Sequence, residues 1–118
     1  MAQLSKMFGG VVPGGVITIT PGTPIAVTSN LNLSDKVFSL LCRQIGFSLD
    51  ASASGEVYVN YGNTPGKGTQ TALIIQSGQT QALPVNSRCV EGEIDAARWY
   101  VDGSASCVVA VSFADASN

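Results

Sequence analysis

Short runs of β-branched residues, separated by glycine and proline, extend along almost the whole chain. β-branched side chains favour extended backbone, and glycine and proline mark turns. The expected strands are Val16–Thr20, Ile25–Thr28, Lys36–Phe47, Glu56–Tyr61, Thr69–Gln76, Gln79–Val85, Arg98–Val101 and Cys107–Phe113. Short strands at this spacing predict an all-β fold, an antiparallel, jelly-roll-like β-sandwich of about eight strands.

The 118 residues are enough for one domain with a single core. Residues 1–15 form a Gly-rich arm that carries apolar side chains but cannot hold a fold alone. Residues 16–118 are expected to form the sandwich domain. The apolar residues of the arm, which we expect to pack on a neighbouring subunit or a larger surface, are Leu4, Met7, Phe8, Val11 and Val12.

Residues 36–47 fit two secondary structures. A helix is favoured by apolar residues four positions apart, Leu33, Val37, Leu41 and Ile45, with Gly46 as a stop. A core strand is favoured by the apolar run that begins at Val37, and the neighbouring segments all indicate strands. We therefore expect a strand here.

Three turns are expected to join neighbouring strands. Asp102-Gly103 is a preferred hairpin pair and lies before Cys107–Phe113, whose alternate residues form an inward row. Ser77-Gly78 predicts a second tight turn, which returns the chain into Gln79–Val85. The glycine-rich segment Gly62–Gly68 predicts a long hairpin tip. It lacks the residue order of a phosphate-binding loop, and exposed hairpin tips often carry binding residues.

Charge and composition exclude several functions. The chain has no histidine and only 12% charged residues, so most acid–base and nucleophilic catalysis lacks its usual base. We expect no enzyme activity and no cofactor. The six Lys and Arg residues are scattered, which argues against nucleic-acid binding. No apolar run is long enough to cross a membrane, and glycines break the N-terminal apolar stretch, which makes it a poor signal peptide.

So little charge favours a homo-oligomer that buries apolar surface over a monomer with a Ser, Thr, Gln and Asn surface. The aromatic residues Tyr58, Tyr61 and Trp99 are expected in the core or a subunit interface, with a sugar-binding platform as the alternative. Trp99 and Tyr100 are adjacent and should face opposite sides of a strand.

Two clusters have a plain structural explanation beside a chemical one. Glu91, Glu93 and Asp95 alternate on one side of an extended segment and could hold Ca²⁺, but a solvated loop fits them better, and we expect no metal. The three cysteines form no metal-binding pattern. Cys42 and Cys107 lie in apolar stretches and indicate core positions, whereas Cys89 lies in a polar one. A single disulfide among them stays open.

The order of four motifs resembles that of small virion structural proteins of tailed bacteriophages. An early strand, Val16–Thr20, precedes a G-x-V-Y-V-x segment at residues 55–60. The L-x-x-G-x-x-x-x-L hairpin of those proteins then corresponds to the stretch from Leu73 through Gly78 to Leu83, which has four residues before the glycine instead of two. Tyr100-Val-Asp-Gly-Ser104 precedes the last strand. The likeness covers residues 16–114, apart from the Gly62–Gly68 loop and the acidic stretch at Glu91–Asp95.

This resemblance implies a role rather than a site. It implies a capsid decoration, or cement, protein that binds the major capsid protein and stabilises the outer surface of the head shell. It also implies a homotrimer made in the bacterial cytoplasm and located on the virion. A fibre, collar or tail component is the first alternative, and a carbohydrate-binding β-sandwich module is the second.

Overall fold

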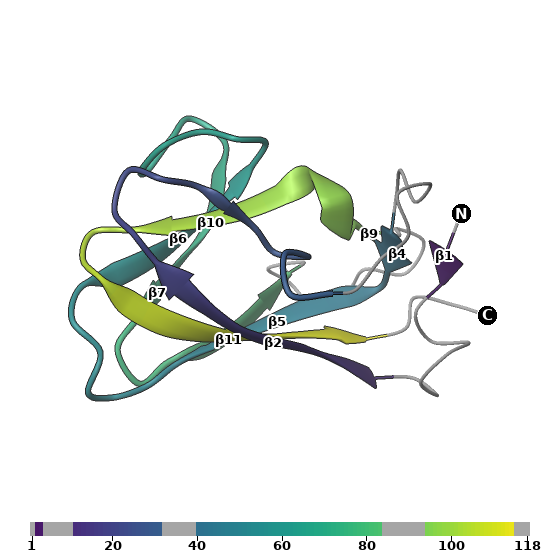
Figure 1. Cartoon of the computed structure of the whole chain (residues 1–118), viewed down its shortest axis with the longest axis horizontal. Helices are drawn as coiled ribbons and strands as arrows, with labels where there is room; N and C mark the ends of the chain where they lie inside the picture. Colours follow the sequence, from purple (N-terminus) through teal and green to yellow (C-terminus); the bar gives the residue numbers. More distant parts are fainter. Residues whose placement is uncertain (1, 4–10, 32–39, 84–93, 115–118) are drawn as a thin grey trace.

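A computed structural model describes residues 2–3, 11–31, 40–83 and 94–114 (Figure 1). These ranges form β-strands and one short 3-10 helix, η1 (Ala96–Arg98). The strands are β1 (Ala2–Gln3), β2 (Val11–Ile19), β3 (Ile25–Ala26), β4 (Leu40–Cys42), β5 (Gln44–Leu49), β6 (Glu56–Tyr61), β7 (Thr71–Gln76), β8 (Thr80–Leu83), β9 (Ile94–Asp95), β10 (Trp99–Gly103) and β11 (Cys107–Ala114). No helix within these ranges has the length and apolar character needed to cross a membrane.

The fold is a jelly-roll sandwich of two antiparallel four-stranded sheets, in the orders β2-β11-β5-β8 and β3-β10-β6-β7. The paired strands are nested along the chain: β2 with β11, β3 with β10, β5 with β8, and β6 with β7. This nesting is that of one long hairpin wrapped around a core, which gives the jelly roll. A third small sheet, β1-β4-β9, lies at one end of the sandwich (Figure 1). The predicted all-β sandwich is therefore confirmed.

The core lies between the inner faces of the two large sheets. Alternate residues of β6 and β10, such as Val57, Val59 and Val101, are fully buried on one side. Alternate residues of β11 are buried on the other. Burying each such side chain contributes about 1.5–3 kcal/mol, so this double row is the main source of stability. The expected inward row of β11 is confirmed for Val109, Val111 and Phe113, and Cys107 packs against its edge.

Most expected strands are present, with shifted ends. Glu56–Tyr61 has the predicted bounds. Residues 40–42 and 44–49 are strands, which confirms the strand interpretation there, whereas residues 36–39 lie outside the described part. β2 begins at Val11, five residues before the expected start at Val16, so the end of the predicted arm pairs with β11.

Two expected hairpins are wrong. β10 and β11 belong to different sheets, as do β7 and β8, so both connections cross from one sheet to the other. Gln79 N–H still bonds the Gln76 carbonyl and Gly78 has a φ of +81°, so a tight turn forms at the second place. A tight turn at a jelly-roll corner therefore has the sequence of a hairpin turn, but the strands that it joins do not pair.

Asp102-Gly103 is not a turn but the end of β10. A Cβ on Gly103 would stand 2.8 Å from Cγ2 of Ile19 and 2.9 Å from the carbonyl oxygen of Glu56. The glycine is required because strand β10 approaches its neighbours closely at this position. Asp102-Gly103 thus indicates a hairpin turn in the sequence, but in the structure it allows close packing at the end of β10.

We predict that Gly103→Ala lowers the free energy of unfolding by about 1–3 kcal/mol, because backbone atoms must move to admit the methyl group. Urea unfolding followed by circular dichroism measures this change. Ser106→Ala, at an exposed position in the following connection, is the control and should leave the midpoint unchanged. Equal midpoints for both variants would contradict the close approach.

Candidate binding surfaces

The structure describes only part of the set of residues that the sequence singled out. Leu4, Met7 and Phe8 lie outside the described residues. The backbone of Val11 and Val12 forms the start of β2, paired with the end of β11.

The three aromatic candidates divide into two groups. Tyr61 and Trp99 are direct partners on β6 and β10, and their rings meet edge to face at 5.2 Å. Trp99 packs against the core, while Tyr61 is 41% exposed. Tyr58 lies on the outer face of the same sheet, where its hydroxyl donates to Glu56 at 3.4 Å. The three rings therefore do not share a single platform.

The outer face of the sheet β2-β11-β5-β8 carries no charge. Its side chains follow from the strand alternation and register. They are Pro13, Val16 and Thr18 on β2, Val108, Ala110, Ser112 and Ala114 on β11, Gln44, Gly46 and Ser48 on β5, and Thr80 and Ala82 on β8. None is acidic or basic, and we call this surface the charge-free face. The nearest charged residues in sequence, Arg43 and Asp50, lie beyond the two ends of β5.

The charge-free face carries two exposed valines and a row of small residues. Val16 and Val108 are 61% and 45% exposed, the highest values among the large hydrophobic residues that the structure describes. Ser112, Gly46 and Ala82 are successive register partners on β11, β5 and β8. A Cβ on Gly46 would stand 2.8 Å from Oγ of Ser112, so a larger side chain would crowd its neighbour there.

The opposite sheet is partly covered by the Gly62–Gly68 loop, which joins β6 and β7 as the predicted hairpin tip. Two fully buried polar side chains of the sheet hold this loop. Asn60 Nδ2 donates to the carbonyls of Thr64 at 2.8 Å and Gly66 at 2.6 Å. Asn60 Oδ1 accepts from the Thr71 hydroxyl at 2.6 Å. The loop is thereby fixed to the sheet.

The carboxylate of Asp102 provides the second attachment. Its Oδ1 accepts from the backbone N–H of Gly22 at 3.0 Å and of Gly103 at 2.8 Å, and its Oδ2 accepts from the N–H of Gly66. One buried side chain thus ties the β2–β3 turn and the β6–β7 loop to β10. Buried polar groups are normally paired in this way, because an unpaired one costs about 1–3 kcal/mol.

Sequence reasoning missed Asn60 and Asp102. Asn60 could have been noticed as an amide within the apolar strand Glu56–Tyr61. Asp102 precedes a glycine, so the sequence predicted a turn there, and its burial was not predicted. The role of Asp102 depends on backbone N–H groups that lie 36 and 80 residues away in sequence, and that of Asn60 on the fold of the loop that follows it.

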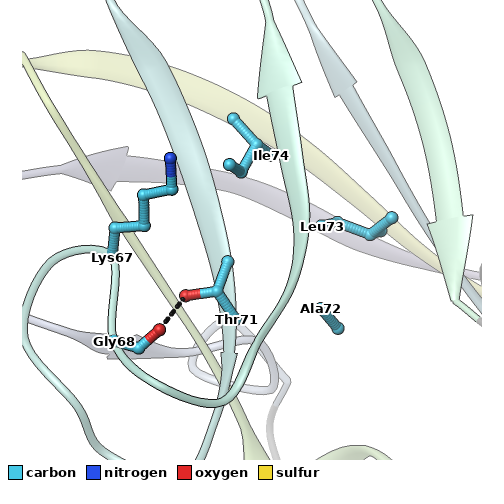
Figure 2. Close-up of a pocket in the computed structure, with 6 residues that line it drawn as sticks. All are labelled: Lys67, Gly68, Thr71, Ala72, Leu73 and Ile74. Carbon is cyan, nitrogen blue, oxygen red and sulfur yellow. Dashed lines mark hydrogen bonds between the residues drawn. The ribbon is translucent and has the colours of Figure 1, made fainter.

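An open hollow of about 410 Å³ lies beside the tethered loop (Figure 2). It is lined by Lys67 and Gly68 of the loop and by residues 71–74 of β7. The Lys67 side chain extends from the loop beside the strand, and Thr71 bonds the Gly68 carbonyl at 2.9 Å at the base (Figure 2). Lys67 is the only charged residue among those that line the hollow.

The acidic and cysteine candidates have local roles where the structure describes them. Glu91, Glu93 and Cys89 lie outside the described residues. Asp95 accepts from the N–H of Ala97 at 3.1 Å, caps η1 and pairs with Arg98 at 3.6 Å. In the described ranges, no three His, Cys, Asp or Glu side chains group as metal ligands.

Both described cysteines are core or near-core residues, as expected. Cys42 is buried, and its Sγ lies 3.5 Å from the Ile94 carbonyl. Cys107 has a free, partly exposed thiol beside a second hollow of about 320 Å³, next to Asp50 and Ser52. Hydrogen bonds from Ser52 lower the pKa of Asp50, and partial burial raises the pKa of Cys107.

Comparison with known proteins gives no relative. No family model, curated protein or solved structure matches the chain.

We predict that Asn60→Ala destabilises the protein by about 2 kcal/mol and exposes the loop, because two loop carbonyls lose their donor and the Thr71 hydroxyl loses one of its two acceptors. Trypsin cleavage after Lys67 under native conditions should accelerate at least tenfold. Asn63→Ala, at an exposed position of the same loop, is the matched control and should leave the cleavage rate unchanged. Similar cleavage rates in both variants would show that the loop does not depend on Asn60.

We also predict that Cys107 reacts slowly with iodoacetamide at neutral pH. Only the thiolate reacts, and a raised pKa keeps the thiol protonated to higher pH than the ordinary value of about 8.5. Alkylation of the Cys107 peptide, followed by mass spectrometry across pH 7 to 10.5, gives its midpoint. A midpoint at or below that of a short peptide with the same sequence would contradict the effect of burial.

Proposed function

We propose that this chain is a structural protein of a bacteriophage virion that decorates the outer surface of the head shell. Two facts support this. The order of motifs from Val16 to Phe113 resembles that of small virion proteins of tailed phages, and jelly-roll sandwiches are common among viral coat domains. A fold alone does not define a function, so the proposal depends on the surface.

The charge-free face is the observation that carries the proposal. A domain with exposed Val16 and Val108 on a sheet face without charge is suited to packing against protein. Decoration needs a binding surface and a stable scaffold rather than a reactive site. In this proposal the sandwich is the scaffold and the charge-free face is a binding surface.

The arm provides the second contact in this proposal. Its apolar residues Leu4, Met7 and Phe8 bind the shell or a neighbouring subunit. Many copies on one lattice turn weak single contacts into firm attachment, because each bound contact raises the effective concentration of the next. A short arm of this kind is therefore sufficient for attachment.

Deleting residues 1–10 tests the proposal. The deletion removes β1 but leaves β2, which begins at Val11, and hence both four-stranded sheets. The shortened protein should fold, with an unchanged circular dichroism spectrum, and should bind purified heads lacking the protein at least tenfold more weakly in co-sedimentation. Deletion of residues 115–118, beyond the end of β11, is the control and should bind normally.

Two results would contradict this assignment. One is unchanged attachment of the protein that lacks residues 1–10. The other is density for the protein on a fibre, collar or tail in maps of whole particles, which would support the alternative virion position.

A further inference from the structure

We propose that the charge-free face packs against the same face of a second copy, the two being related by a twofold axis. The inference rests on the proposed structural role and names a partner for this surface. In a twofold contact each patch meets itself, so like charges near the axis would face one another. This face has no such charge at any of its strand positions.

Charge also argues against other surfaces of the chain as the partner. The opposite sheet presents Glu56 at its outer face, and the tethered loop beside it presents Lys67. Packing either of these on the charge-free face would remove a charge from water without supplying an opposite charge, which is costly. The charge-free face, placed against itself, buries no charge.

The distribution of side-chain sizes on the face is compatible with a twofold contact. Val16 and Val108 lie on the neighbouring strands β2 and β11, whereas Ser112, Gly46 and Ala82 are register partners on β11, β5 and β8. A half turn about an axis in the plane of the contact, between these two groups, brings the valines of each copy toward the small residues of the other. Side chains of packed sheets interdigitate in this way.

The area is sufficient for a specific but modest contact. Four strands spaced about 4.8 Å apart, each of 4–9 residues rising about 3.4 Å per residue, give a face of about 500 Å². Two such faces bury about 1,000 Å², the lower limit for a specific interface. We therefore expect a dimer that forms at micromolar concentration and strengthens when neighbouring copies are held on a lattice.

The mass of the protein in solution tests this pairing. Sedimentation equilibrium between 1 and 200 µM should give twice the chain mass of 12.1 kDa, about 24 kDa, at the upper concentrations. Ala110→Lys places a charge at the centre of the face and should weaken dimerisation at least tenfold while the protein stays folded. Val108→Lys, at another exposed position of the same face, is a second variant with the same expected result.

Gln76→Lys is the matched control, since it adds the same charge at an exposed strand position of the opposite sheet and should leave the dimer intact. Three results would overturn the pairing: a monomer at all concentrations, an oligomer unaffected by both face variants, or a trimer. A trimer is the size that the resemblance implies, and it cannot pair one face with itself in every subunit.

The same variants separate this inference from the proposed function. A dimer that dissociates with Ala110→Lys but never binds heads would retain the pairing and reject the decoration role. Binding to heads by a protein that is monomeric in solution would retain the decoration role and reject the pairing.

Discussion

The contact between the two inner sheet faces is the constraint on which the whole molecule depends. Each strand must place one row of side chains at the centre, such as Val57 and Val59 from one side and Val109 and Val111 from the other. Because alternate residues point in opposite directions, this requirement also decides what every outer face displays. It further requires the chain to cross repeatedly between sheets, so the rims of the sandwich consist of turns and loops that need separate attachment.

Those attachments are polar, and they make the two outer faces different. On the β3-β10-β6-β7 sheet, Asn60 and Asp102 occupy outward positions, yet both are fully buried because loops lie over them. On the β2-β11-β5-β8 sheet, the outward positions carry uncharged side chains, and no loop among the described residues buries Val16 or Val108. One face is therefore covered by loops of its own chain, whereas Val16 and Val108 of the other stay exposed.

The sequence predicted local structure well and pairing poorly. Alternation within Glu56–Tyr61 and Cys107–Phe113 identified strands and their inward rows, because period-two burial is a local property. It did not identify the crossing after Asp102-Gly103, since a turn into the same sheet and a turn into the opposite sheet use the same residues. The charge-free face also could not be predicted in detail, because Gly46, Ala82 and Ser112 become neighbours only through register.

The nested pairing of strands has a consequence for engineering. The first and last strands of the sandwich are direct partners, with Val11 opposite Ala114, so the chain enters and leaves the sandwich about 5 Å apart (Figure 1). A domain whose ends lie so close together is suited to insertion into a surface loop of a host protein, because the two ends of the host loop need not move apart to accommodate it. It is equally suited to circular permutation, in which a short linker joins the old ends and new ones open at a rim loop.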